Sequence, residues 1–135
     1  MPLSDTLQIA ASGAKAQDDR LRIIAENLAN ADSTASVPGG QPYRRKIITF
    51  QNVLDKELGV EVVKVANRGY DNSDFQKKYD PAHPAADDQG YVLYPNVNTV
   101  VEMVDMQEAR RAYEANLNVV SVSKAMLTQT IDLLR

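Results

Sequence analysis

The chain has 135 residues, a formal charge of −3 and no cysteine or tryptophan. This length suits one modest domain, and the nearly balanced charge gives no electrostatic reason to expect a nucleic-acid partner. The absence of cysteine excludes disulfides, thiolate metal ligands and a cysteine nucleophile. No stretch approaches the ~20 apolar residues of a membrane-spanning helix. The first residues also lack the basic start and apolar core of a secretory signal, so any export is expected to occur without a cleaved signal.

The first predicted element is a helix over residues 4–31, within an N-terminal segment of residues 1–34. Ser4 is the expected N-cap, and Asp5 places a carboxylate in the first turn, where it suits the helix dipole. Apolar and small residues recur at alternating steps of three and four from Leu3 to Leu28, and Gln17 interrupts them once. This spacing is typical of a helix that packs along another helix.

A β-rich middle domain with long loops is predicted for residues 35–95. Apart from Pro2 and Gly13, all prolines and glycines of the chain lie between residues 37 and 98. KIITF at residues 46–50 and GVEVVKVA at residues 59–66 carry the β-branched residues of strands, and GYVLYP near Gly90 suggests a third. NRGYDNSD and YDPAHPAADDQG are expected to be the least regular parts.

The last segment, residues 96–135, is predicted to be a second long helix, because no glycine or proline follows Pro95. A heptad-spaced stripe begins at Tyr113 and continues to Leu134, with Lys124 as its polar interruption. A second stripe beside it includes Val119, Val122 and Met126, so the apolar arc is wider than one partner helix can cover.

The two helices are expected to fold back on one another as an antiparallel coiled coil, which makes the fold class α+β. We predict the register that places Gln17 opposite Lys124, because a single polar layer commonly fixes register. The predicted seam comprises Leu7, Ala10, Ala14, Gln17, Leu21, Ile24, Leu28, Tyr113, Leu117, Val120, Lys124, Leu127, Ile131 and Leu134.

The apolar surface outside this seam predicts contacts with further helices. An isolated pair of helices is marginally stable, so copies of the chain or other proteins are expected to cover the remaining faces. Side-chain amides beside the stripes are either solvated helix surface or hydrogen-bonded across such contacts. The predicted intersubunit residues are Ile9, Ile23, Asn27, Asn30, Asn116, Val119, Val122, Met126 and Leu133.

No catalytic or ligand-binding constellation is evident, so no enzyme activity, cofactor or metal is predicted. His83 is the single histidine and has no placed nucleophile. The aspartates near it lack the ordered ladder of a calcium loop, which favours an ordinary loop rich in Asp and Pro. Arg44, Arg45 and Lys46 form the one basic run, which we interpret as an edge or subunit contact, with nucleic-acid binding a distant second.

Three segments carry a resemblance to a known family: LRIIAENLANADST at residues 21–34, PYRRK at residues 42–46 and YPNVNTVVEMVDMQEARRAYEANLNVV at residues 94–120. They resemble the signatures of the bacterial flagellar rod and hook axial family, in the form typical of the proximal rod, and the resemblance covers nearly the whole chain. It implies a non-enzymatic building block that leaves the cytoplasm through type III export without a cleaved signal. It further implies helical polymerisation, with the terminal helices forming a tube around the export channel.

The resemblance also implies where the protein acts and what it meets. The location would be the basal-body rod, which crosses the periplasmic space. The implied partners are proximal and distal rod proteins, copies of the chain, the membrane-ring/rod adaptor and the export gate, with no nucleic acid or small-molecule substrate. A soluble adaptor that binds one helical partner through its terminal helices is the competing hypothesis, and a hydrolase or small-ligand enzyme is a weaker third.

Overall fold

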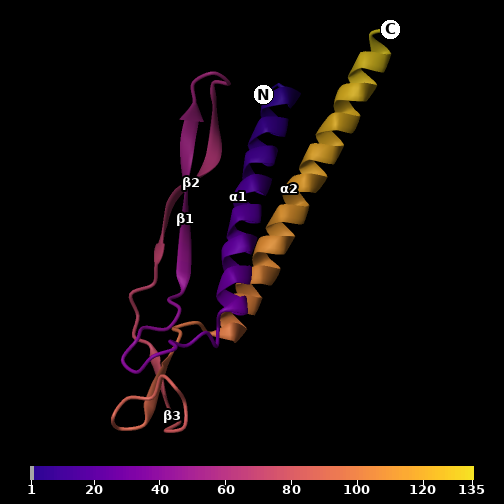
Figure 1. Ribbon diagram of the computed structural model, residues 1–135. Helices are drawn as coiled ribbons and strands as arrows, with labels where there is room; N and C mark the ends of the chain where they lie inside the picture. The colour runs from indigo at the N-terminus through magenta and orange to yellow at the C-terminus, as the bar shows by residue number, and fades with distance from the viewer. Residues whose placement is uncertain (1) are drawn as a thin grey trace. The chain divides into compact units, whose positions relative to one another are not determined.

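A computed structural model describes residues 2–135 of the chain. Along the chain, four strands lie between two long helices, and the strands form two small antiparallel sheets (Figure 1). The elements are α1 (Leu3–Ala29), β1 (Lys46–Asp55), β2 (Val60–Tyr70), β3 (Gln76–Tyr79), β4 (Tyr91–Tyr94) and α2 (Thr99–Leu133). The terminal helices contact one another and run antiparallel, which confirms the predicted α+β class.

The chain folds as two compact units, and each unit contains a part of both helices. One unit consists of the N-terminal residues through Leu21, residues 48–67 and residues 107–135. The other consists of residues 22–47 and 68–106. The domain boundaries predicted after residues 34 and 95 separate the elements by their order along the chain. These boundaries stay a prediction.

The helix starts differ from those predicted by a few residues. The Pro2 carbonyl accepts hydrogen bonds from the backbone N–H of Asp5 at 3.0 Å and of Thr6 at 3.4 Å. Ser4 therefore lies inside the first turn of α1, and its predicted N-cap role is wrong. At the start of α2 the N-cap is Asn98, whose Oδ1 accepts hydrogen bonds from the N–H groups of the second and third helical residues.

The strands β1 and β2 form a hairpin that packs on the first part of α1. Gly59 closes the turn with φ of 69°, a conformation that glycine adopts without strain. Val60 and Val62 alternate with exposed residues and are buried, as the partial alternation predicted. The Oγ of Ser12 on α1 accepts a hydrogen bond from the N–H of Val63 at 3.2 Å, so this strand is tied to the helix by a polar contact as well.

The second sheet pairs β3 with β4, with Gln76 opposite Tyr94 and Tyr79 opposite Tyr91. Val92 in β4 is fully buried, whereas every residue of β3 is exposed. The sequence did not predict β3 because QKKY has neither apolar alternation nor β-branched residues.

Between the hairpin and α2, the first part of α1 is covered on two sides (Figure 1). Its face toward α2 is built from small side chains, among them the buried Ala10 and Ala14. A Cβ added to Gly13 would lie 3.0 Å from Nδ2 of Asn116 on α2. The small residues therefore allow the two helix backbones to approach closely.

This packing shows that the predicted register is wrong. Asn116 lies against Gly13, and Glu108 lies 3.7 Å from Arg20 in an ion pair. Gln17 falls between these two contacts and so lies about three helical turns from Lys124. The stripe on α2 is also shifted by one residue from the prediction. It was predicted to contain Leu117 and Lys124, but both are exposed. Their neighbours Asn116 and Ser123 take these positions, and Ser123 is buried.

The same register leaves the end of α2 without a partner on α1. Since α1 begins at Leu3, its pairing with α2 ends near Met126, and α2 continues beyond it (Figure 1). Ile131 and Leu134, both predicted in the seam, are exposed in this overhang.

A coupled substitution tests the close contact between α1 and α2. Gly13→Ala gains about 1 kcal/mol of helix propensity, but its Cβ meets the Asn116 side chain. We expect Gly13→Ala to stabilise the protein more in an Asn116→Ala background than in the wild type, by about 0.5 kcal/mol or more. Urea unfolding of the wild type and the three variants of this double-mutant cycle measures the difference, and additive effects would contradict the contact.

Candidate functional site

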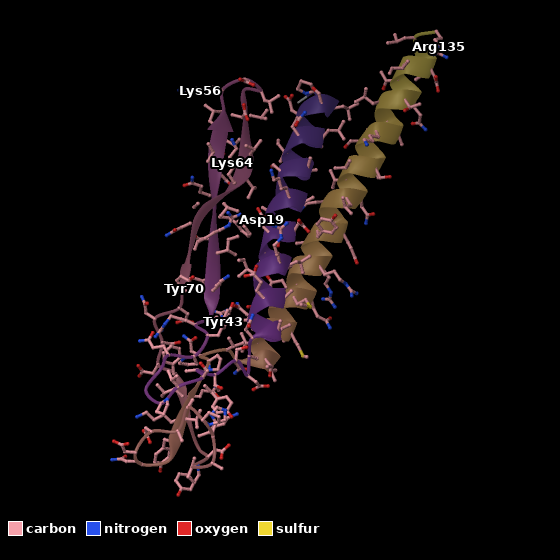
Figure 2. The ribbon with its side chains drawn as sticks, viewed as in Figure 1. Asp19, Tyr43, Lys56, Lys64, Tyr70 and Arg135 are labelled. Carbon is pink, nitrogen blue, oxygen red and sulfur yellow. The ribbon has the colours of Figure 1, made fainter. Side chains whose placement is uncertain are left out.

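A polar cluster joins the end of α1, the start of β1 and the start of α2. We define it by six residues: Asn27, Tyr43, Arg45, Asp71, Asn96 and Glu102. All of them lie in the unit of residues 22–47 and 68–106, and Figure 2 shows Tyr43 beside the end of α1.

Asn27 is the centre of this polar cluster and is 1% exposed. Its Oδ1 accepts hydrogen bonds from the N–H of Lys46 at 2.9 Å and the hydroxyl of Tyr43 at 2.8 Å. Its Nδ2 donates to the Lys46 carbonyl at 2.9 Å and to the Glu102 carboxylate at 3.4 Å. The side-chain amide thus pairs with Lys46 as a neighbouring strand would and joins β1 to both helices.

Asn96 plays a similar part just before α2. Its Oδ1 accepts a hydrogen bond from the N–H of Arg45 at 2.8 Å, and its Nδ2 donates to the carbonyls of Asp71 and Ser73. The Asp71 N–H donates to the Arg45 carbonyl at 2.9 Å. These bonds satisfy backbone groups where the β1–β2 ladder ends.

Arg45 supplies the positive charge of the polar cluster. Its Nε is paired with the carboxylate of Glu102, which is 1% exposed, and its Nη1 lies 3.4 Å from Asp71. Burial opposes the charged form of Arg45, but the hydrogen bonds to the two carboxylates outweigh it and raise the pKa of the guanidinium. The pKa of Asp71 is lowered most by the hydrogen bond from the Ser73 backbone N–H, and then by the Ser73 side chain and by Arg45. Burial raises the pKa of Tyr43.

The basic run at residues 44–46 is therefore used inside the chain. Arg44 donates to the carbonyls of Asp71 and Ser73 and lies over the ring of Phe75. Lys46 forms a 2.7 Å ion pair with Glu26. The interpretation of this run as an edge or subunit contact stays a prediction, and these side chains remain partly exposed beside their intrachain partners. One feature of the sequence indicated the pairing of Arg45. Glu102 is a charged residue among the apolar residues at the start of α2, and such a charge needs a cation if it is buried.

Exposed apolar side chains follow one flank of α2, beside the face that packs on α1. We call Val119, Val122, Met126 and Leu133 the outer stripe; they are 42%, 58%, 50% and 87% exposed. Their spacing of three, four and seven residues places them on one face of the helix. At the other end of α2 lies a group of equally exposed apolar residues that was not predicted from the sequence, namely Val100, Val101, Met103 and Val104.

The other predicted assembly residues fall in different surroundings. Asn27 was predicted to contact another subunit, but its four hydrogen bonds are all intrachain, so that assignment is corrected. Asn30 caps its own helix end by donating to the Glu26 carbonyl and accepting from Ser33, and Asn116 lies against Gly13. Ile9 and Ile23 are half-buried.

Several predicted seam residues are buried or half-buried, and others are not. Ala10, Ala14 and Ile24 are buried. Half-buried are Leu7, Gln17, Leu21, Leu28, Tyr113, Val120 and Leu127. Exposed are Leu117, Lys124, Ile131 and Leu134. A carbonyl oxygen of Gln17, Oε1, is buried without a hydrogen-bond partner.

Residues 2–135 contain no group of three or more His, Asp or Glu side chains that could hold a metal ion. Within the same residues, neither helix is long and apolar enough to span a bilayer.

Comparison with known proteins places the chain among flagellar proteins. Residues 88–133 match the family model of the flagellar basal body rod FlgEFG protein C-terminal region, and residues 7–35 match that of the flagella basal body rod protein. These two matches include most of both helices.

Three relatives cover nearly the whole chain, and each is described as flagellar basal-body rod protein FlgC. The protein of Agrobacterium fabrum is 52% identical over 99% of this chain and 96% of its own length. That of Borreliella burgdorferi is 40% identical over 100% and 99%, and that of Escherichia coli O157:H7 is 41% identical over 98% of both. With such identity over such coverage, the chain belongs to the FlgC family of flagellar basal-body rod proteins, which are structural and not enzymatic.

Proposed function

We propose that this chain polymerises helically, with copies of itself and with other rod proteins, into the proximal rod of the flagellum. In this arrangement the rod transmits torque and leaves a central channel for export. Membership in a family of rod proteins supports assembly with other rod proteins. The distal rod proteins, the membrane-ring/rod adaptor and the export gate are the further partners we propose.

The observation that carries this proposal is the exposed outer stripe of α2. Val122 and Met126 are half or more exposed on a helix that already packs on α1 along a neighbouring face. Full burial of an exposed Val or Met side chain contributes about 1.5 to 3 kcal/mol, and about half of that surface is still exposed at Val122 and Met126. Covering the outer stripe therefore favours assembly. The overhang of α2 beyond α1 adds Leu133 to the same surface and extends it past the subunit's own core.

Two adjacent cysteine variants test whether assembly covers this surface. The chain has no natural cysteine, so each introduced thiol is unique. We expect Val122→Cys to react with a maleimide in the purified chain and to be protected in isolated basal bodies, because a neighbouring subunit covers it. The matched control is Ser123→Cys, which is 4% exposed at the next position and should be unreactive in both states.

The identity of the covering protein follows from a cysteine-to-amine cross-linker placed at Val122→Cys. Cross-links to another copy or to other rod proteins would support the proposal. Full reactivity of this thiol in basal bodies would contradict it, and cross-links to one non-rod protein alone would favour the adaptor hypothesis.

A further inference from the structure

The face of α2 that packs on α1 does not end where α1 begins. Its residues recur at steps of seven, and those that lie beside α1 are buried or half-buried. They form two series, namely Ala109, Asn116, Ser123 and Tyr113, Val120, Leu127. The next members of the two series are Thr130 and Leu134, which lie in the overhang, where α1 offers no partner (Figure 1).

Within the overhang this face carries no charge. We call Leu127, Thr130, Ile131 and Leu134 the overhang face; they lie within about 100° of one another around the axis of α2. The hydroxyl of Thr130 donates to the carbonyl of Met126 at 2.9 Å, so it is satisfied within the helix. Ile131 and Leu134 are 49% and 83% exposed. The overhang face is thus apolar and largely open, and it shares no residue with the outer stripe beside it.

We propose that the overhang face binds an amphipathic helix of a neighbouring rod subunit, placed on α2 in line with α1. This inference rests on the function proposed above, and it names the kind of segment that meets this end of the chain. A helix is the expected partner because the overhang face continues the α1–α2 interface without interruption. The spacing that accommodates α1 is therefore available to a second helix for about two further turns.

Other partners fit the overhang face less well. A strand presents its side chains with a period of two, which does not match residues that recur at steps of three and four. An interfacial contact with lipid needs basic residues along the polar side of the helix, and residues 127–135 contain only Arg135 as a basic residue, together with the acidic Asp132. Asp132 lies on the side of the helix away from the overhang face, so it does not oppose an apolar helix there.

Thiol protection in the assembled rod tests this proposal. Ile131→Cys should react with a maleimide in the purified chain, because this position is half-exposed there. In isolated basal bodies we expect its reaction rate to fall about tenfold or more, because a neighbouring helix covers it. The matched control is Asp132→Cys at the next position, whose reaction rate should change by no more than about threefold. Equal protection of the two thiols would overturn the assignment to this face.

Photo-cross-linking identifies the segment that covers Ile131. A photo-reactive amino acid with a benzophenone side chain, incorporated in place of Ile131, couples to nearby C–H groups in the assembled rod. A helix should give cross-linked positions three and four residues apart within one segment of a rod protein. Cross-linked positions two residues apart, or cross-links to lipid, would overturn the proposal.

The reactivity of Val122→Cys separates this inference from the proposed function. If Val122→Cys is protected in basal bodies while Ile131→Cys stays reactive, the overhang face has no partner and the inference fails, whereas assembly through the outer stripe stands. If both thiols stay reactive, both proposals fail.

Discussion

Replacing Arg45 with alanine is expected to lower the free energy of unfolding by about 3 kcal/mol or more, because it leaves a buried carboxylate without its cation. Glu102 is 1% exposed and is paired with the Arg45 guanidinium. The same substitution removes the guanidinium from Asp71. Urea unfolding monitored by circular dichroism gives the change in free energy, provided the slope of the transition is unchanged.

The adjacent arginine provides a matched control for Arg45→Ala. Arg44 also bonds to backbone carbonyls and lies over Phe75, but it pairs with no buried carboxylate in those contacts, so Arg44→Ala should cost about 1 kcal/mol. Adding Glu102→Gln to Arg45→Ala should recover part of the loss, since the buried group is then neutral. An Arg45→Ala variant no less stable than Arg44→Ala would contradict the central place of this ion pair.

Introducing glutamate at both Val119 and Met126 is expected to abolish swimming while leaving the isolated chain folded. Both side chains are already exposed in the single chain, so the substitutions should change its unfolding free energy by no more than about 0.5 kcal/mol. In an apolar interface each buried, unpaired carboxylate would cost several kcal/mol. Motility on soft agar and the yield of isolated basal bodies are the measurements.

The control for this double variant keeps the surface apolar. Val119→Ile together with Met126→Leu retains apolar side chains of similar size, and these cells should swim. If the glutamate variant swims normally, the outer stripe is not an assembly surface. If it fails because the isolated chain no longer folds, circular dichroism of the purified protein will show it.

The sequence predicted the elements of this fold better than their pairing. Both helices and three of the four strands follow from periodicity, β-branched residues and the positions of glycine and proline. The register failed because it assumed that large apolar residues face the partner helix and that two polar residues mark one layer. In the structure Gly13 makes room for Asn116, while Leu117 and Lys124 are exposed.

The polar cluster could not be predicted from sequence spacing because its members come from distant parts of the chain. Asn27 and Glu102 are 75 positions apart, and a helical pattern describes only neighbours three or four residues away. The side chain of Asn27 was interpreted as a surface amide because nothing local shows that it pairs with the backbone of Lys46. The outer stripe was accessible to sequence reasoning because it lies on a single helix.

A density map of the assembled basal body, resolved well enough to trace side chains, will show directly whether the outer stripe is an assembly surface. We expect neighbouring rod subunits to cover Val119, Val122 and Met126, and Leu133 in the overhang to contact a subunit other than its own. A map in which this face of α2 borders solvent, with the contacts between subunits made elsewhere, would contradict it.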